Sequence, residues 1–340
     1  MAYLAWADDR WWMFVANSVA HFLFVPVGLV LLTAVVFRHR GLALVALIPT
    51  IIAAASFGAS FVPVPVRSWW SSFVDGPSTA MAPQAPADVD AAAARERGIT
   101  VLTFNIHAEN DDLDGVAASI LAADTDVVAL QEVGEAMGPE LRERLRDEYP
   151  YASFTFRSGW GGLAVLSRFP ISPGSGWFEP ITSGNPQVLI LATPVGDVDL
   201  VHLHNASLPR NVGEWPELIP SAIAEREAVS RSIAAYAQRS RRPLLVVGDF
   251  NTTERSTAYA ILHEVLRDAW REAGFGLGST FPGGSRSPTP YDLRLPWWLI
   301  RIDYVFHSDA FEATGARIGQ WDGQSDHRPV VVELAWRGGG

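Results

Sequence analysis

The chain has 340 residues, of which 49% are hydrophobic, no cysteine, and a formal net charge of −11. The absence of cysteine excludes disulfide bonds and thiol chemistry. Residues 1–98 carry six acidic and six basic side chains, which leaves 31 acidic and 20 basic side chains, and hence all of the net charge, to the remainder. A protein that binds duplex nucleic acid usually presents a basic stripe, and this acidic remainder shows none.

Two long apolar runs, at 11–37 and 41–66, contain no Asp, Glu, Lys or Arg. Each exceeds the roughly 20 residues that a helix needs to cross a bilayer. Only Arg38-His39-Arg40 separates them, so we expect a hairpin of two transmembrane helices that makes residues 1–66 a membrane anchor. Interfacial aromatic residues are expected at the outer ends of such spans, where the sequence has Trp11, Trp12, Trp69 and Trp70.

The charge of the connecting loop predicts the orientation of this anchor. Arg38 and Arg40 concentrate positive charge there, which predicts a cytoplasmic loop. The protein is then a multi-pass protein of the cell membrane whose C-terminal part is extracytoplasmic. Two alternatives remain open at this point. In the first alternative, the run at 11–37 is a buried core helix. In the second alternative, the run at 41–66, which contains Ala53-Ala54-Ala55, is a signal peptide.

Residues 67–98 are rich in Pro, Ala, Ser and Asp without a sustained period, which is typical of a linker. Residues 99–340 follow as one domain in which apolar residues recur at helical or strand spacing. In the first of its predicted helices, Val116, Ile120 and Leu121 share one face. Helices are predicted at about 112–123, 138–148, 218–239 and 256–268.

Polar side chains stand at the ends of several apolar, β-branched runs in this domain. Asn105, Glu132 and Asp249 each follow such a run, and Asp303 precedes one. Because strand ends lie at the rim of a sheet, these side chains are expected to converge. Ser325-Asp326-His327 closes the series. Carboxylates, amides and a histidine together suit one task, which is to hold a hard divalent cation against a phosphate and to activate water.

In this order the segments resemble the endonuclease/exonuclease/phosphatase superfamily, which includes deoxyribonuclease I and neutral sphingomyelinases. The resemblance covers about residues 99–336. It implies an α/β fold, a four-layer αββα sandwich of two packed β-sheets with helices outside, here preceded by the N-terminal transmembrane hairpin. The matching segments are Thr103-Phe104-Asn105 and residues 126–132, 162–170, 201–204, 248–251, 301–306 and 325–330.

The resemblance also implies roles for the metal-binding and water-activating residues. Glu132 is the principal Mg²⁺ ligand, with Asn105 and Asp326 in the metal shell, and Mn²⁺ is the alternative ion. Mg²⁺ prefers a few oxygen ligands and keeps several waters, so one firm carboxylate is enough. Asp249 orients and deprotonates the attacking water, while Asn251 donates to a phosphoryl oxygen.

The histidines receive their roles in the same way. His327 stabilises the developing charge or protonates the leaving oxygen, and Asp303 orients it, because a carboxylate fixes the tautomer of an imidazole and raises its pKa. His204 contributes a second donor to the phosphate. The choice between His202 and His204 stays open, since both lie on one face of the same strand. His107 is interpreted as a loop residue rather than a ligand.

Trp297 and Trp298, just before the strand of Asp303, are candidate substrate-binding residues. One interpretation places them in the lipid interface of a tethered domain, where they bring the site to a phospholipid head group. The other has them pack in the core at the start of that strand. The sequence favours neither.

These observations predict a membrane-anchored, Mg²⁺-dependent phosphoesterase that hydrolyses a phosphodiester with metal- and Asp-activated water. Its substrate is expected to be a phospholipid or a small extracytoplasmic phosphodiester. The other expected partner is the lipid bilayer, and no protein partner is implied. The first alternative is an extracytoplasmic endonuclease or exonuclease, which the acidic domain disfavours. The second is a non-catalytic binding module, against which the complete motif set argues.

Overall fold

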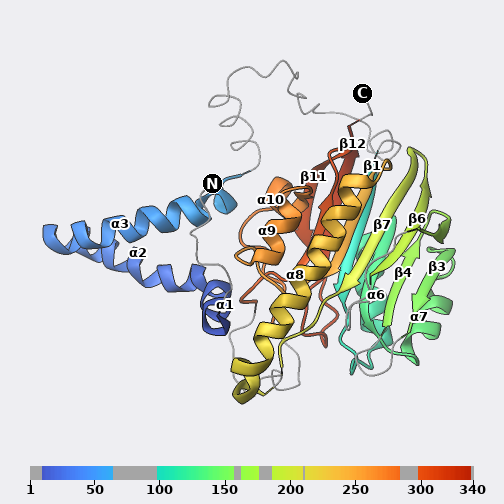
Figure 1. Cartoon of the computed structure of the whole chain (residues 1–340), viewed down its shortest axis with the longest axis horizontal. Helices are drawn as coiled ribbons and strands as arrows, with labels where there is room; N and C mark the ends of the chain where they lie inside the picture. Colours follow the sequence, from blue (N-terminus) through green and yellow to red (C-terminus); the bar gives the residue numbers. More distant parts are fainter. Residues whose placement is uncertain are drawn as a thin grey trace.

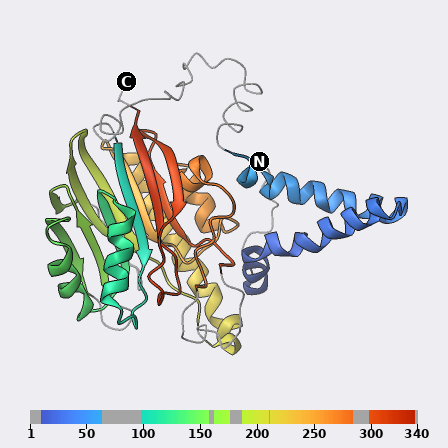
Figure 2. The ribbon, with the colours of Figure 1, turned by 180° about the vertical axis from the view of Figure 1, so that it is seen from behind.

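Two β-sheets packed face to face form the centre of the protein, with helices on their outer faces (Figures 1 and 2). The computed structural model describes residues 10–63, 98–156, 162–175, 186–209, 211–283 and 298–337, without the side chains of residues 23–25. This layered arrangement confirms the predicted four-layer αββα sandwich. The first strand begins at Gly98, and the predicted domain boundaries stay predictions.

The first sheet has the strand order β11-β12-β1-β2-β4-β3. β1 pairs in parallel with β2 and antiparallel with β12. Helices α6 (Leu113–Ala123) and α7 (Met137–Leu145) pack on its outer face. The strands are β1 (Gly98–Asn105), β2 (Val127–Val133), β3 (Tyr151–Thr155), β4 (Gly162–Ser167), β11 (Phe311–Ile318) and β12 (Val330–Trp336).

The second sheet has the strand order β5-β6-β7-β8-β10-β9. β7 pairs in parallel with β8, and β8 pairs antiparallel with β10. Helices α8 (Trp215–Arg239) and α9 (Thr257–His263) cover its outer face, and η2 (Val212–Glu214) precedes α8. The strands are β5 (Ile171–Pro173), β6 (Gln187–Thr193), β7 (Gly196–His204), β8 (Leu244–Asp249), β9 (Arg267–Asp268) and β10 (Asp303–His307).

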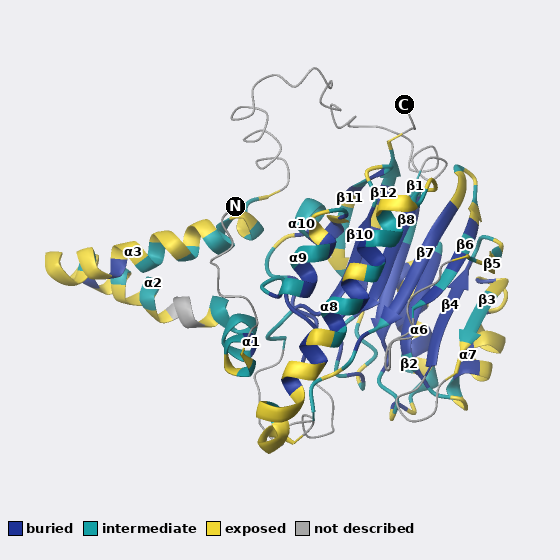
Figure 3. Cartoon of the chain, viewed as in Figure 1, coloured by how far each residue is buried: buried dark blue, intermediate teal, exposed yellow. Residues whose placement is uncertain are grey.

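The alternation of side chains along each strand divides the core into three layers. In β1, Val101 points between the sheets, whereas Leu102 and Phe104 point outward beneath α6. In β8, Val247 points between the sheets and Val246 packs beneath α8 and α9. Figure 3 shows these central strands buried along most of their length. Both faces of each sheet are therefore apolar, which explains why the sequences of these strands are nearly continuous hydrophobic segments.

The predicted helix at 256–268 is wrong in its second half, because α9 ends at His263. Arg267 and Asp268 pair with β10 as the short strand β9. The Asp268 carboxylate then accepts a hydrogen bond of 2.9 Å from the backbone N–H of Trp270 and begins α10 (Ala269–Ala273). The N-cap carboxylate starts the next helix, and α9 has already ended five residues before it.

The N-terminal segment folds into α1 (Trp11–Ser18), α2 (Ala20–Val36), α3 (Arg40–Phe57) and η1 (Gly58–Phe61). The stretch Arg40–Phe61 is long and apolar enough to cross a bilayer. The predicted first span is not one straight helix, because α1 and α2 meet at a bend of 60°. These two helices make a further candidate span only if they are counted as one. The expected linker from residue 67, with Trp69 and Trp70, lies outside the described residues up to residue 97.

Contacts between α1 and the sandwich domain accompany this bend. Phe14 of α1 is buried against Ile219 and Ile223 of α8, and its ring lies 5.2 Å from the Arg226 guanidinium. These contacts hold α1 on the domain, whereas α2 turns away at Val19 and packs beside α3 (Figures 1 and 2).

The base of α3 is also attached to the domain. The Arg255 guanidinium lies 4.4 Å from the centre of the Phe57 ring. The Gly276 backbone N–H donates to the Ser60 carbonyl at 2.7 Å. Figure 1 shows α2 and α3 projecting from this base away from the sheets. The hairpin is therefore fixed to the domain at its base.

Candidate active site

The topology brings the predicted strand-end residues to one edge of the sandwich. β1 and β2 are parallel, as are β7 and β8, so the carboxyl ends within each pair meet at the same edge. His204 stands opposite Asp249 in the register of β7 and β8. Asp303, the first residue of antiparallel β10, stands opposite Asp249 on its other side. Three predicted site residues therefore lie on adjacent strands.

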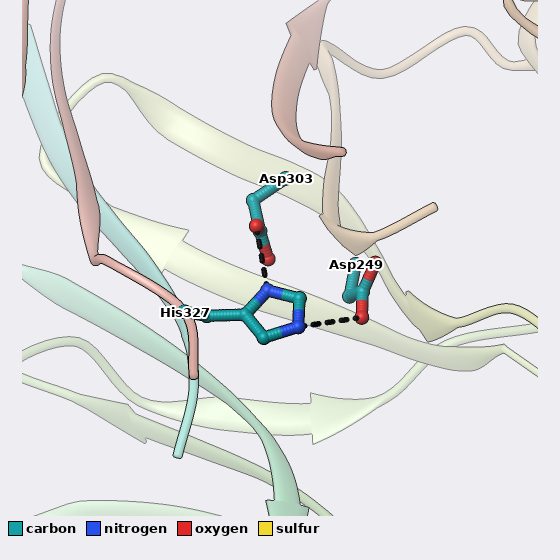
Figure 4. Close-up of side chains that lie close together, drawn as sticks. All are labelled: Asp249, Asp303 and His327. Atoms are coloured by element: carbon teal, nitrogen blue, oxygen red, sulfur yellow. Dashed lines mark hydrogen bonds and ion pairs between the residues drawn. The ribbon is translucent and has the colours of Figure 1, made fainter. Parts of the chain in front are cut away.

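Asp303, His327 and Asp249 form a buried group at the centre of this edge (Figure 4). The Nδ1 atom of His327 lies 2.8 Å from Oδ2 of Asp303, and its Nε2 atom lies 3.7 Å from Oδ2 of Asp249. Burial alone would lower the pKa of His327, but the two carboxylates outweigh burial and raise the pKa to about 10. His327 is therefore an imidazolium at neutral pH, with Nε2–H directed toward Asp249.

The spacing of this group would also suit a metal ion, because one ligand atom from each residue lies within 4.8 Å of the others. An imidazolium has no lone pair to offer a cation. The raised pKa of His327 therefore favours a role as proton donor rather than as a ligand. The Oδ1 atom of Asp303 is buried and has no hydrogen-bond partner in the described part of the chain.

Asp249 is surrounded by donors that fix its carboxylate. Oδ1 accepts from the Asn251 backbone N–H at 2.8 Å, and Oδ2 accepts from the side-chain amides of Asn251 and Asn105, each at 3.1 Å. Burial raises the pKa of Asp249 to about 6, with His327 opposing and Asp303 adding to the rise. A carboxylate with a pKa close to neutrality is suited to act as a general base.

Glu132 is the centre of a second group of ligands beside this triad. Its carboxylate accepts from Asn105 Nδ2 and from the Ala108 backbone N–H, each at 2.9 Å. Burial would raise the pKa of Glu132, but the His204 imidazole and these two donors outweigh it and lower the pKa. Asn105 donates to both Glu132 and Asp249, so in this structure it holds the two carboxylates together.

The residues around Glu132 include oxygen ligands that a divalent cation takes. The pKa of Glu132 is lowered, so its carboxylate can offer ionised oxygens. The His107 Nδ1 atom lies 3.8 Å from Oε2 of Glu132 and 3.6 Å from Oδ1 of Asp326. His107 lies in the loop that follows β1, and its interpretation as a loop residue rather than a ligand stays a prediction.

The structure separates the two histidines of β7. His204 Nε2 lies 3.6 Å from both Glu132 Oε1 and Asp249 Oδ2. His202 is fully buried one step deeper, with Nε2 2.7 Å from the Gln131 amide nitrogen and Nδ1 3.4 Å from the Gln187 oxygen. His204 therefore lines the site, and His202 belongs to a polar network between the sheets.

Backbone strain is concentrated at this site. Among the described residues other than glycine, positive φ angles occur at His107 (66°), Glu132 (58°) and Asn251 (50°) within the site, and at three positions elsewhere. Such conformations are sparsely populated and often mark functional sites. Strand pairing shows the effect at Glu132, where the β2–β4 register shifts between Gln131 and Val133. The shift turns the Glu132 side chain toward the edge of the sandwich.

Trp298 lies next to the site, whereas Trp297 falls outside the described residues. The Trp298 ring is half-buried, 4.2 Å from the Arg328 guanidinium and 5.7 Å from the Trp321 ring. Arg328 follows His327 directly. This aromatic stack therefore belongs to the loops around the imidazole rather than to the core between the sheets.

A buried ionic cluster supports the strand that carries Asp303. The Arg301 guanidinium donates twice to Asp268, at 2.6 and 2.9 Å, and its Nε donates to Glu254 at 3.1 Å. The Arg301 side chain is 3% exposed and that of Asp268 is fully buried. Arg301 outweighs burial and lowers the pKa of Asp268 and of Glu254. The chain direction into β10 is thus fixed two residues before Asp303.

A cavity of about 730 Å³ lies between the base of the hairpin and the domain. Its hairpin side includes Asn17 and His21 as well as Ile52, and its domain side includes Glu254 as well as Ile300. Both walls of the cavity therefore mix polar and apolar side chains.

Comparison with known proteins gives the same architecture. The sequence model of the Endonuclease/Exonuclease/phosphatase family matches residues 102–327. No curated protein matches the chain. A structure from Beutenbergia cavernae, described as an endonuclease/exonuclease/phosphatase, is 24% identical with a TM-score of 0.54, covering 71% of this chain and 72% of that one.

Two further solved structures share the fold. Sphingomyelinase C from Streptomyces griseocarneus is 21% identical with a TM-score of 0.53, covering 69% of this chain and 99% of its own. Truncated TDP2 from Caenorhabditis elegans is 17% identical with a TM-score of 0.53, covering 70% of this chain and 98% of its own. At these identities the likeness concerns the fold, and chemistry has to be argued from the residues.

Proposed function

Because the chain belongs to the endonuclease/exonuclease/phosphatase family, we propose that it is a membrane-anchored, divalent-cation-dependent hydrolase of phosphodiesters. The observation that carries this proposal is that one site contains both a carboxylate that can accept a proton and an imidazolium that can donate one. Asp249, with a pKa of about 6, faces the His327 imidazolium, with a pKa of about 10. A deprotonated base and a protonated donor are thus available together near neutral pH.

In the proposed mechanism, Asp249 takes a proton from the attacking water, and the Asn251 amide donates to a phosphoryl oxygen. The His327 Nε2–H stabilises the developing negative charge or protonates the leaving oxygen, while Asp303 holds the Nδ1 side of the ring. The gap of 3.7 Å between Nε2 and Asp249 is too long for a direct hydrogen bond. The Nε2–H of His327 is therefore not committed to Asp249 and can face the reacting phosphate.

Glu132 and Asp326 would hold the cation, with Asn105 positioning the Glu132 carboxylate. A bound Mg²⁺ or Mn²⁺ ion supplies charge neutralisation for the phosphate and acidifies water. The family and the donor set support this part of the proposal.

The membrane anchor is proposed from the surface of the hairpin. α2 and α3 leave many large apolar side chains uncovered, among them Leu32 at 61%, Phe37 at 70% and Val45 at 73% exposure. Soluble monomeric proteins rarely expose contiguous apolar surface on this scale. Yellow colouring along both helices in Figure 3 shows how far it extends. With Arg38 and Arg40 in the loop, the positive-inside tendency places the catalytic domain outside the cytoplasm.

A phospholipid or a small phosphodiester outside the cytoplasm is the proposed substrate class. A structural relative named as a sphingomyelinase shares the fold. The domain also lacks the excess of basic residues that duplex nucleic acid requires.

The test is an activity panel on the purified full chain in detergent, with phospholipids, nucleic acids, sugar phosphates and a chromogenic diester and monoester. We expect diester hydrolysis that a chelator abolishes and Mg²⁺ or Mn²⁺ restores. Asp249→Asn should lower kcat by about a hundredfold or more. Asp197→Asn, the same change at an exposed position in β7, should not. Full turnover in chelator would remove the cation from the mechanism.

A further inference from the structure

Ser325 is fully buried and lies two residues before His327 in the chain. Its Oγ atom accepts a hydrogen bond of 3.0 Å from the His327 backbone N–H and donates one of 2.7 Å to the Asn105 backbone carbonyl. A backbone N–H only donates and a carbonyl only accepts, so the single hydroxyl proton of Ser325 has one direction. One hydroxyl therefore connects the end of β1 to the loop that carries His327.

The Asn105 end of this connection reaches the two carboxylates of the site. β1 pairs with β12 as far as Thr103, so the Asn105 carbonyl lies beyond the last strand pair and accepts from Ser325 instead. The side-chain amide of Asn105 donates to Glu132 at 2.9 Å and to Asp249 at 3.1 Å. A shift of the Asn105 backbone would therefore move the amide that holds both carboxylates.

Ser325 is itself held in place by its backbone. The Ser325 N–H donates to Oδ1 of Asp322 at 3.1 Å, and the Ser325 carbonyl accepts from the Trp321 indole N–H at 2.8 Å. The Asn110 amide donates to Asp322 at 2.6 Å and to the Ile106 carbonyl at 2.8 Å, which ties Asp322 to the loop after β1. Buried polar networks in which the groups are bonded are rigid. The position of the Ser325 hydroxyl is therefore fixed independently of the side chains that it orients.

We infer that Ser325 is a positioning residue of the reaction, whose hydroxyl sets the His327 imidazole and the Asn105 amide relative to each other. The inference rests on the proposed function, because it concerns the same site, and it adds to that site a residue that acts through two others. Misplacement of a reacting group by about 1 Å can lower a rate a hundredfold. Loss of this one hydroxyl should therefore be visible in kcat.

A serine that only stabilises the fold makes a different prediction. Its removal would lower Tm, and the molecules that remain folded would keep the wild-type kcat. Ser167 provides the comparison, because it is also fully buried and its Oγ accepts from the backbone N–H two residues later, that of Phe169, at 2.9 Å. Ser167 pairs with Val127 at the start of β2, whereas Glu132 lies near the other end of that strand. Ser167 therefore makes the same kind of hydrogen bond away from the site.

The experiment compares Ser325→Ala, Ser325→Cys and Ser167→Ala in the detergent-purified full chain. A thiol is a weak donor and a weak acceptor, so Ser325→Cys is a second, milder variant should Ser325→Ala not fold. We expect kcat on the chromogenic diester to fall about tenfold to a hundredfold in Ser325→Ala and by less in Ser325→Cys, with KM little changed. Ser167→Ala should lose Tm and keep its kcat. Wild-type kcat per folded molecule in both Ser325 variants would overturn the inference and leave the hydrolase proposal in place.

Proton nuclear magnetic resonance gives a readout that does not depend on turnover. The proton between His327 Nδ1 and Asp303 Oδ2, which lie 2.8 Å apart, should give a far-downfield signal that disappears in His327→Ala. In both Ser325 variants this proton should exchange faster with water and its signal should broaden, whereas Ser167→Ala should keep it. An unchanged signal in both Ser325 variants would overturn the inference. A wild type that hydrolyses no diester, with the signal still broadened in both Ser325 variants, would overturn the proposed function and support the placement of His327 by Ser325.

Discussion

Replacement of Asp268 by asparagine tests whether the buried ionic cluster holds the catalytic strand in place. The change removes one charge and little volume. Asparagine keeps an oxygen that can accept from the Trp270 backbone N–H, so the start of α10 is preserved. What is lost is the charge partner of Arg301, whose two donor bonds to Asp268 span 2.6 and 2.9 Å.

The expected loss of stability follows from burial. The Arg301 side chain is 3% exposed and that of Asp268 is fully buried, so the guanidinium keeps its charge without its main counter-charge. Breaking a buried pair in this way typically costs about 3–5 kcal/mol. For a domain of this size that corresponds to a decrease in Tm of about 6 °C or more. Because Arg301 precedes Asp303 by two residues, kcat should fall as well.

The assay is thermal unfolding of the detergent-purified full chain, followed by near-ultraviolet circular dichroism, with the diester assay alongside. Asp309→Asn is the matched control, because Asp309 pairs with Arg267 at the surface and its side chain is 81% exposed. An exposed pair contributes about 0.2–1 kcal/mol. Equal, small effects in both variants would refute the reasoning from burial.

Three further predictions use other parts of the structure. Gly248→Ala should destabilise the domain by about 2 kcal/mol or more and reduce activity. Gly248 has a φ angle of +143°, and a Cβ at this position would lie 1.9 Å from the Leu203 carbonyl oxygen. A variant with wild-type Tm and activity would contradict this prediction. The pKa values of Glu254 and Asp268 are lowered in the folded state. The stabilisation from these carboxylates is therefore present above about pH 4 and is lost as the pH falls through their folded-state pKa values. The Tm of the wild type should consequently decrease more steeply with acidification than the Tm of Asp268→Asn. For orientation, protease added to intact cells, or to spheroplasts where an outer membrane exists, should cut the linker at residues 67–98 and divide the chain into an anchor fragment and a domain fragment. Protection of the linker until the membrane is permeabilised would invert the topology.

The strand-end rule explains why so much of the fold could be predicted from sequence. Asn105, Glu132 and Asp249 each end an apolar β-branched run, and parallel pairing brings such ends together whatever the loops between them do. The order of the motifs then indicated the two-sheet sandwich. Local pattern and global topology agree in these strands, so little tertiary information was needed.

Other features depend on contacts that no local pattern encodes. His202 and His204 have the same strand parity, and only their depth, set by Gln131 across the sheets, separates them. The pairing of Arg267 and Asp268 with β10, where a helix was predicted, depends on a strand that lies far along the chain. His107 lies near two carboxylates and has a φ angle of 66°. Positive φ at a residue other than glycine has no reliable sequence signal.

The docked hairpin also constrains the order in which the chain folds. His21 of α2 lies 2.9 Å from the Leu299 carbonyl oxygen, a contact between residues 278 positions apart, and Arg255 donates to the Ser56 carbonyl across 199 positions. Helices form from local contacts, whereas these attachments need a nearly complete polypeptide. During synthesis α2 and α3 would therefore form first and attach to the domain only after Leu299 has been made. Attachment to the domain is then among the last events of maturation.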